Sequence, residues 1–366
     1  MSDTGEKNNI RFLKRLALSS LLFLAAIAGI VILFDPFYHY HAPLGSMKAV
    51  LQDRDWQVAG TLDHFSYDSV VLGNSLVENT NTHWIEELYG NRAVKAIRAG
   101  GSNAELCFYM DRAFEAQKLE RVFYCIDKSI LCADPDTTLD GFDYSFLLDR
   151  DPLNDGKYLW NKDVLLKKIP LQLACNTVLD YDEGEAYDWY RTKTFSAEAM
   201  IIHYEPAGEF SAMQPVEELL KFLPENLRML RERIKTHPET EFVLFFPPSS
   251  LLWWDQELRG GELEADRELL RRLCTAFSDC ENVKLYAFFA EEAYCELENY
   301  MDVSHFSPEV NRKLFEDMAA GRCLMTSEKT EEGIARMDER IRRFSSEEIR
   351  DYYPEAVLLP DPSPAP

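Results

Sequence analysis

Residues 68–101 read DSVVLGNSLVENTNTHWIEELYGNRAVKAIRAGG, and this stretch decides the fold. Its first part, Asp68–Leu72, is mostly apolar and ends at a glycine, which predicts a buried strand. Thr82–Tyr89 has the apolar spacing of an amphipathic helix, also closed by a glycine. Lys95–Ile97 then predicts a second short strand, followed by a glycine pair. Strand, helix and strand in this order form one unit of a parallel sheet.

The same alternation continues along the chain. Three further strands are predicted at Arg121–Ile126, Glu241–Phe246 and Val283–Phe289. Helices are predicted at Asn103–Gln117, at Glu225–Thr236, at Glu262–Phe277 and after Ser307-Pro308. Strands separated by helices pair in parallel through right-handed crossovers. We therefore expect an α/β fold, a three-layer α/β/α sandwich around a five-stranded parallel sheet of flavodoxin-like type.

The expected core domain covers residues 66–322. Residues 133–223 interrupt its rhythm and are rich in Tyr, Trp, Asp and Pro, so we predict an insertion beside the loop edge of the sheet. Residues 35–65 are expected to form a juxtamembrane linker. Residues 323–366 predict a charged helical extension with a Pro-rich tail that stays disordered.

The N-terminal segment has a different composition from the rest. Residues 16–34 (LALSSLLFLAAIAGIVILF) carry no charge, and four cations precede them. As a helix they would span about 28 Å, close to a hydrocarbon core of about 30 Å. We predict a single-pass signal anchor at 16–34, with residues 1–15 as a cytoplasmic stub and the remainder extracytoplasmic. The alternatives are a signal peptide cleaved at 26–28 and a cytoplasmic protein that buries the helix.

Charge limits the partners of the chain. Its 366 residues carry 39 Lys and Arg against 63 Asp and Glu, a net charge of −24. This acidic field repels phosphate backbones, so nucleic acid is not expected as a partner. Residues 1–34 carry +2, which leaves −26 for the rest and favours neutral or cationic ligands there. Through residues 16–34, the lipid bilayer is an expected partner.

No cofactor or metal is expected from the sequence. The eight cysteines are scattered, without the spacing of a metal or redox motif, although their even number permits disulfides. The acidic stretch 180–188 (DYDEGEAYD) lacks the spacing of an EF-hand loop, so we interpret it as a solvated loop.

Three strands are followed by polar residues, at the edge where open parallel sheets bind ligands. Ser75 lies in the turn after the first strand, and Asp302 and His305 follow the fifth. A serine hydroxyl needs a base to become nucleophilic, which His305 could supply with Asp302 orienting its ring. Taken singly, Ser75 and Asp302 could instead cap a helix or turn, and His305 could be a surface residue.

The groups that would complete this site come from the neighbouring loops. The backbone N–H groups of Ser75 and Gly101 are predicted oxyanion donors, with Asn103 as a side-chain donor or, alternatively, a helix N-cap. Trp253 and Trp254 follow the fourth strand and could form a sugar-stacking or acyl-binding wall, or pack on the core. The predicted substrate contacts are Asn74, Ser249, Trp253 and Trp254.

The order Gly-x-Ser, a glycine after the second strand and a late Asp-x-x-His resembles the SGNH (GDSL-like) hydrolase superfamily over residues 66–322. The anchor and the segments 34–43 (FDPFYHYHAP) and 302–311 (DVSHFSPEVN) are similar to bacterial cell-envelope members. These include the D-alanyl transfer protein of teichoic acid synthesis and SGNH partners of membrane-bound O-acyltransferases. The resemblance implies Ser75 as nucleophile, His305 as base and Asp302 as its orienter. By this resemblance, an acylated envelope glycan or polyol and a membrane-bound O-acyltransferase are expected partners.

The chain departs from the family pattern at two places. Asn74 stands where the family has Asp, and Ile126–Ser129 replaces the Gly-x-Asn-Asp block, whose Asn donates to the oxyanion. Two hypotheses follow. The first is a membrane-anchored extracytoplasmic serine esterase or O-acyltransferase, acting on an acyl ester of an envelope glycan or polyol. The second is a catalytically degenerate domain, a glycan-binding or scaffold subunit of a membrane acylation or polymer-export complex.

Overall fold

The computed structural model describes residues 2–360, with side chains from residue 7 onward, and it divides into two compact units. Unit 1 comprises the chain up to Phe65 together with Asp140–Glu183. Unit 2 comprises Ser66–Leu139 and the chain from Gly184 onward. The expected insertion, 133–223, is therefore divided between the units, because its middle part groups with the N-terminal residues.

Unit 2 is built on a five-stranded sheet in which every pair is parallel, as predicted, with the order β2-β1-β3-β4-β5. Strand β1 pairs with the edge strand β2 on one side and with the central strand β3 on the other, through Ser69 opposite Ala93 and Arg121. The strand bounds differ from the predicted ones by no more than two residues. They are β1 Ser69–Gly73, β2 Ala93–Ile97, β3 Arg121–Cys125, β4 Glu241–Phe246 and β5 Val283–Ala287.

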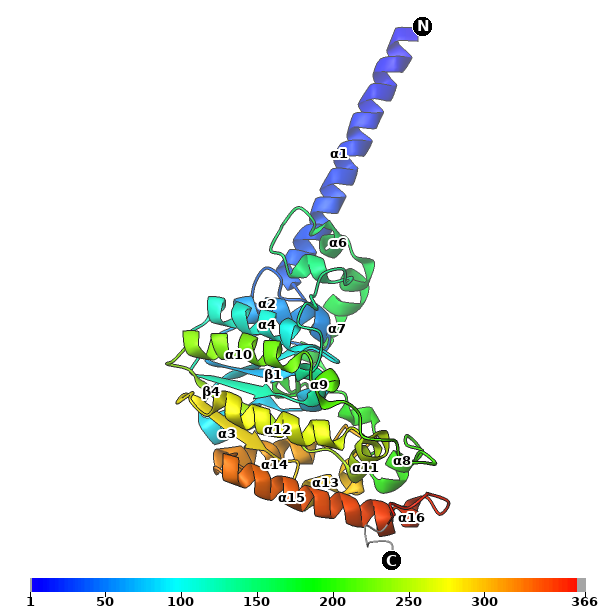
Figure 1. Cartoon of the computed structure of the whole chain (residues 1–366). Helices are drawn as coiled ribbons and strands as arrows, with labels where there is room; N and C mark the ends of the chain where they lie inside the picture. Colours follow the sequence, from blue (N-terminus) through cyan, green and yellow to red (C-terminus); the bar gives the residue numbers. More distant parts are fainter. Residues whose placement is uncertain (1, 361–366) are drawn as a thin grey trace, which may run out of the picture. The chain divides into compact units, whose positions relative to one another are not determined.

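Helices connect these strands and cover both faces of the sheet (Figure 1). The helices and the shorter turns between them are η1 Ser75–Val77, α3 Thr82–Tyr89, α4 Asn103–Ala116, α5 Lys128–Leu131, η5 Tyr190–Thr192, α8 Ala197–Ile201, α9 Val216–Leu219, α10 Leu223–Thr236, α11 Leu251–Gly260, α12 Leu263–Phe277, α13 Glu292–Cys295, η6 Leu297–Asn299 and α14 Pro308–Ala319. The predicted helices are present as α3, α4, α10, α12 and α14, whereas α11 was not predicted.

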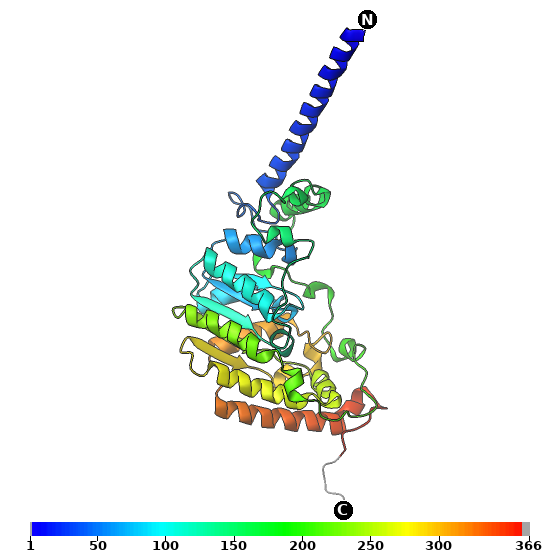
Figure 2. The same ribbon diagram turned by 45° about the horizontal axis from the view of Figure 1, so that its top comes forward.

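Successive side chains along each strand point to opposite faces of the sheet, so neighbouring residues pack against different helix layers. On one face Phe123 packs in a core cluster with Ile85 of α3 and Phe315 of α14. On the other face Tyr124 reaches α4, where its hydroxyl donates to Asn103 at 2.8 Å. Helices α4, α10 and α12 pack side by side along the sheet (Figure 2). The three-layer α/β/α prediction is confirmed.

The C-terminal extension is helical, as expected, and its apolar side is buried. It consists of α15 Ser327–Arg343, η7 Phe344–Glu348 and α16 Ile349–Tyr352. Phe344 and Ile349 belong to the same core cluster as the sheet residues. The predicted disordered tail lies, from residue 361 onward, outside the described residues.

Unit 1 is formed by a long N-terminal helix and short helices that pack at its C-terminal end. Helix α1 runs over Ser2–Phe34, and its Lys7–Phe34 part is long and apolar enough to cross a membrane. The expected linker, 35–65, contains α2 and belongs to the folded unit. The other elements are α2 Arg54–His64, η2 Ser145–Leu147, α6 Gly156–Leu159, η3 Val164–Lys168, α7 Ile169–Thr177 and η4 Glu183–Glu185, the last at the boundary between the units.

Candidate active site

Ser75 stands on a tight turn at the carboxyl end of β1. Gly73 ends the strand, and a Cβ at Gly73 would lie 2.6 Å from Val77 Cγ2, so the close return of the chain requires glycine. The Asn74 side chain caps the turn by accepting a hydrogen bond from the Leu76 N–H at 3.1 Å. Helix η1 begins at Ser75 itself. The turn therefore presents the Ser75 hydroxyl at the ligand-binding edge of the sheet.

A continuous chain of hydrogen bonds links Ser75, His305 and Asp302. The Ser75 Oγ lies 2.9 Å from His305 Nε2. On the other side of the ring, His305 Nδ1 lies 2.9 Å and 2.8 Å from the two carboxylate oxygens of Asp302. The serine and the histidine come from positions 230 residues apart, so the fold itself brings them together. The structure thus places the three predicted triad residues within hydrogen-bond reach.

The charge of Asp302 fixes the tautomer of His305. Burial alone would raise the pKa of the Asp302 carboxyl, but hydrogen bonds from His305 and from the Ser304 and His305 backbone N–H groups lower it to about 2. A carboxylate can only accept, so Nδ1 carries the proton. The lone pair of Nε2 is then free to accept the Ser75 hydroxyl proton, which is the polarity a general base requires.

Trp189 completes the histidine's surroundings and was not identified from the sequence. Its ring meets the His305 ring edge to face, with 5.4 Å between centroids and an angle of 89°. Its indole Nε1 donates to the Ser75 carbonyl at 3.4 Å, and its backbone N–H donates to Asn79 Oδ1 at 3.0 Å. Trp189 lies in the predicted insertion, where one aromatic residue among many carries no distinguishing signal.

The predicted oxyanion donor Gly101 is not supported by the structure. Its N–H donates to the Arg98 carbonyl at 2.9 Å and closes a turn. Gly100, one residue earlier, has a φ of +60° and lines the pocket beside Ser75. Among the described residues, the N–H groups of Gly100 and Ser75 have no hydrogen-bond partner. The prediction for Gly101 is therefore corrected: its N–H is engaged in a turn, whereas Gly100 lines the pocket.

Asn103 is also unsuited to the predicted oxyanion role, because its side chain is fully buried and engaged. Its amide Nδ2 donates to the Asn226 carbonyl at 3.1 Å, and its Oδ1 accepts from the Tyr124 hydroxyl at 2.8 Å. The alternative role of N-cap belongs to Ser102, which forms a capping box with Glu105. Asn103 therefore joins helix α4 to its neighbours in the core.

A pocket of about 230 Å³ opens beside Ser75 and His305. Three of the four predicted substrate contacts, Asn74, Ser249 and Trp253, line it. Trp254 does not, because its side chain is 1% exposed and packs inside the protein. Position 254 must therefore be corrected from a substrate contact to a core residue. The apolar part of the lining comes from Leu76, Phe246, Pro247 and Trp253.

The two departures from the SGNH pattern meet in space. The amide Nδ2 of Asn74 donates to Asp127 Oδ2 at 2.8 Å. Asp127 also accepts hydrogen bonds from Ser129 Oγ at 2.7 Å and from the Ile130 N–H at 2.8 Å, which cap the short helix α5. Asn74 and Asp127 thus form an amide–carboxylate pair that joins the turns after β1 and β3.

Lys128 brings a positive charge to the pocket lining, but acidic groups surround it. Its Nζ lies 2.5 Å from Glu257, 2.9 Å from Glu262 and 3.2 Å from Asp266. Three carboxyl groups around one ammonium leave no net positive charge to attract an anionic ligand. The pocket therefore suits an uncharged group better than an anionic one.

Lys95 is a second residue that sequence reasoning missed. It points from β2 into the protein, where only 2% of its surface is exposed. Its Nζ donates to the carbonyls of Glu78 and Thr80 at 2.6 Å and 2.8 Å. These carbonyls belong to the segment that follows the Ser75 turn. Lys95 therefore holds this segment against β2 through two hydrogen bonds. Burial lowers the pKa of Lys95 to about 7.

Among the described residues, no group of three or more His, Cys, Asp or Glu side chains could hold a metal ion. All eight cysteines lie in this part of the chain, and each one is free.

Comparisons with known proteins identify no family for this chain. No family model matches it, and no curated protein does. Among solved structures, one match is described as "The structure of a putative platelet activating factor from Streptococcus pneumonia". It is 14% identical, with a TM-score of 0.38, and the match covers 73% of this chain and 92% of that one.

Proposed function

We propose that this chain is a membrane-anchored serine esterase or O-acyltransferase of the SGNH type, acting on an acyl ester of a cell-envelope glycan or polyol. The observation that carries the proposal is the unbroken hydrogen-bond chain Ser75–His305–Asp302. A serine with a base at 2.9 Å, and a base with an ionised orienter at 2.8 Å, is the arrangement that nucleophilic catalysis needs.

The reaction would proceed through an acyl-enzyme. Ser75 Oγ attacks the acyl carbonyl carbon while its proton passes to His305 Nε2. The tetrahedral intermediate collapses, the ester C–O bond breaks, and the leaving alcohol takes the proton from Nε2. Water or a sugar hydroxyl then attacks the acyl-enzyme by the same steps in reverse. The choice between water and a sugar hydroxyl separates hydrolysis from transfer.

The N–H groups of Ser75 and Gly100 would stabilise the oxyanion. Both residues line the pocket, and neither N–H has a partner among the described residues. The amide donor that the SGNH pattern provides has no counterpart here, because Asp127 accepts hydrogen bonds at that loop. The loss of one such donor typically costs about 10²- to 10³-fold in rate. We therefore expect a slow, specialised enzyme.

The pocket favours a short, uncharged acyl group. Its volume of about 230 Å³ is small, and Leu76, Phe246 and Trp253 supply an apolar wall. Lys128 cannot recruit an anionic substrate, because Glu257, Glu262 and Asp266 surround it. The sugar or polyol would remain in the open part of the pocket.

Helix α1 would hold the protein at the membrane. The Lys7–Phe34 part has a mean hydropathy of 2.7 over its most apolar window, and only 6% of that window is buried. We propose that α1 crosses the bilayer with its N-terminus in the cytoplasm, which puts the catalytic unit outside the cytoplasm. A membrane-bound O-acyltransferase is the partner we propose, since such a partner would supply the acyl group.

Fluorophosphonate labelling of the detergent-solubilised full chain tests the proposed activity. We expect one covalent adduct, on Ser75, that disappears in the Ser75→Ala and His305→Ala variants. The variant Ser278→Ala, which removes an exposed serine hydroxyl at the end of α12, serves as the matched control and should label like the wild type.

The competing function is a scaffold or glycan-binding subunit without catalysis. Gly101 and Asn103, both predicted as oxyanion donors, have other hydrogen-bond partners, and this observation favours the scaffold. A folded wild-type protein that forms no adduct, and that hydrolyses no p-nitrophenyl acetate, would contradict the enzyme and leave the scaffold. An adduct on a residue other than Ser75 would contradict the assignment of the nucleophile.

A further inference from the structure

Residues 156–168 of unit 1, comprising α6 and η3, form a segment that we call the collar. The collar packs against α1, and Figures 1 and 2 both show α6 beside the C-terminal part of that helix. The Trp160 indole Nε1 donates to the Leu24 carbonyl at 3.0 Å. Leu24 precedes the end of α1 by about 15 Å along the helix axis, at about 1.5 Å per residue. The collar therefore covers one side of α1 well inside the apolar run.

The part of α1 that precedes its first partly buried residue is too short to cross a bilayer. After Arg15, residues 16–26 are exposed, and they rise only about 16 Å, roughly half of a hydrocarbon core of about 30 Å. In 27–34 one side of the helix is partly or fully buried, while residues 29, 30, 32 and 33 remain exposed. Shifting the span toward the N-terminus would draw Arg11, Lys14 and Arg15 into hydrocarbon, which is strongly unfavourable. A spanning helix must therefore include residues 27–34, and Val31 among these is fully buried in unit 1.

We propose that the collar is seated in the bilayer leaflet at the C-terminal end of α1, with its exposed side chains among the lipids. The inference rests on the proposed membrane span of α1. If that span crosses the bilayer, the protein packed against residues 24–34 must enter the same leaflet. Unit 1 would then be partly inserted in the membrane and not merely attached to it by a flexible tether.

The exposed chemistry of the collar fits this position. Leu166 is 70% exposed and Trp160 is 51% exposed, next to the apolar helix. Tryptophan is favoured at the membrane interface because its ring is apolar and its N–H is polar. An exposed leucine next to lipid chains is more stable in contact with them than with water.

Charge points to the same partner. The collar carries four lysines, at 157, 162, 167 and 168, and one acidic residue, Asp163, within a chain of net charge −24. Lys167 pairs with Asp163, and Lys168 pairs with Asp53 outside the collar. Four lysines against these two aspartates leave a local charge of +2. Long lysine side chains can lie along apolar surface while their ammonium groups reach the headgroups. Basic segments next to a span are attracted to anionic lipids. This local excess of positive charge therefore matches an anionic lipid surface.

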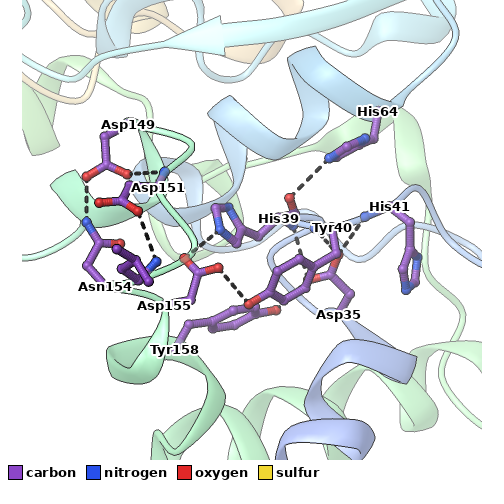
Figure 3. A network of polar contacts seen from close by, with 11 residues as sticks. Asp35, His39, Tyr40, His41, His64, Asp149, Asp151, Asn154, Asp155 and Tyr158 are labelled. Atoms are coloured by element: carbon purple, nitrogen blue, oxygen red, sulfur yellow. Dashed lines mark hydrogen bonds and ion pairs between the residues drawn. The ribbon is translucent and has the colours of Figure 1, made fainter.

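A buried polar network fixes the collar to the end of α1 (Figure 3). The Tyr158 hydroxyl donates to Asp35, the first residue after α1, at 2.7 Å, and Asp35 is fully buried. Asp155, next to the collar, accepts from the Tyr40 hydroxyl at 3.0 Å and lies 2.9 Å from His39 Nε2. The collar cannot swing away from α1 without leaving these buried groups unpaired, which is costly. It must therefore follow the helix into the leaflet.

Quenching of tryptophan fluorescence by brominated lipids tests the proposal. The full chain is reconstituted in phosphatidylcholine vesicles containing phosphatidylglycerol, in which the phosphatidylcholine is brominated on its acyl chains. The chain has six tryptophans, so Trp160→Phe isolates the collar's contribution, and Trp84→Phe, on α3 of unit 2, is the matched control. We expect Trp160→Phe to lose most of the acyl-chain quenching and Trp84→Phe to lose none.

Flotation of the same vesicles separates the two possible failures. A chain that does not float with the vesicles contradicts the membrane span of α1, and the collar proposal fails with it. A chain that floats but shows equal quenching in the wild type and in Trp160→Phe overturns the collar proposal and leaves the span intact. If aqueous iodide, and not brominated lipid, quenches Trp160 in these vesicles, the collar faces water and not lipid, which also overturns the proposal.

Discussion

The turns after β1 and β2 both place glycine and small polar residues at the carboxyl edge of the sheet, yet they use them differently. After β1, the Ser75 hydroxyl forms a hydrogen bond with His305, and Ser75 lines a pocket. After β2, Ser102 caps α4, and Asn103 bonds to Tyr124 and to the Asn226 backbone. The first turn presents a side-chain hydroxyl at the pocket. The second uses its polar side chains, Ser102 and Asn103, inside the protein and contributes only the backbone of Gly100 to the pocket lining.

A polar residue after a strand can satisfy the backbone of the following helix or turn, or it can remain available to a ligand. A buried hydrogen-bond donor or acceptor must find a partner, and the nearest helix N-terminus is the usual one. Asn74 performs that capping task in the first turn, which leaves Ser75 free. In the second turn the capping falls to Ser102 and the core contacts to Asn103. Ser75 is available at the pocket because its neighbour Asn74 forms the capping hydrogen bond of the turn.

Replacing Asp302 should give the largest effect and test the first half of the comparison. In Asp302→Ala, His305 loses the carboxylate that holds its proton on Nδ1, so fluorophosphonate labelling should slow by about 10³- to 10⁴-fold. The fold should remain, because Asp302 lies in a loop and is partly exposed. Labelling rates measured beside circular dichroism check this outcome. The control is Asp111→Ala, which removes a surface carboxylate paired with Arg233.

Replacing Asn103 should have the opposite signature. In Asn103→Ala, the buried Tyr124 hydroxyl and the Asn226 carbonyl lose their partner, which should reduce the free energy of unfolding by about 1–3 kcal/mol. The labelling rate of the folded fraction should not change. Urea denaturation and labelling on the same samples measure both quantities. Slower labelling at unchanged stability would restore Asn103 as an oxyanion donor and break the comparison.

The strands and long helices were predictable because their signals are local. Glu241–Phe246 is apolar at every position after Glu241 and was predicted with the bounds that the structure has. The separation of residues 140–183 into unit 1 was not predictable, because it depends on contacts with residues far away in the chain, such as the Tyr158–Asp35 hydrogen bond. Spacing along the sequence carries no information about such partners.

The candidate site likewise has some residues that the sequence could predict and others that depend on contacts between distant parts of the chain. Ser75, Asp302 and His305 could be proposed from residue type and strand order, because parallel strands deliver their loops to one edge. The backbone donor could not be assigned between Gly100 and Gly101, since the choice depends on which N–H the Arg98 carbonyl accepts. Trp254 was misplaced for a related reason. Trp253 and Trp254 are adjacent in sequence, but helix geometry turns only the first toward the pocket.

Lys95 sharpens the comparison because it belongs to β2 but supports the turn after β1. Its folded pKa of about 7 lies below the unfolded value of 10.5, since burial disfavours the ammonium. Between these values the unfolded chain binds more protons, so stability rises with pH. The difference in unfolding free energy between the wild type and Lys95→Met should therefore grow from pH 7 toward pH 10, by up to about 1.4 kcal/mol per pH unit.

Urea denaturation at several pH values measures this slope, and subtracting the variant cancels the other titrating groups. Lys118→Met, at an exposed position at the end of the connection to β3, controls for the loss of a lysine charge. A flat difference for Lys95→Met would mean that Lys95 keeps its charge when buried, held by the carbonyls of Glu78 and Thr80. The segment after Ser75 would then be held by a charged ammonium that donates to two carbonyl dipoles. The contact between β2 and this segment would be an ion–dipole interaction and not a neutral hydrogen bond.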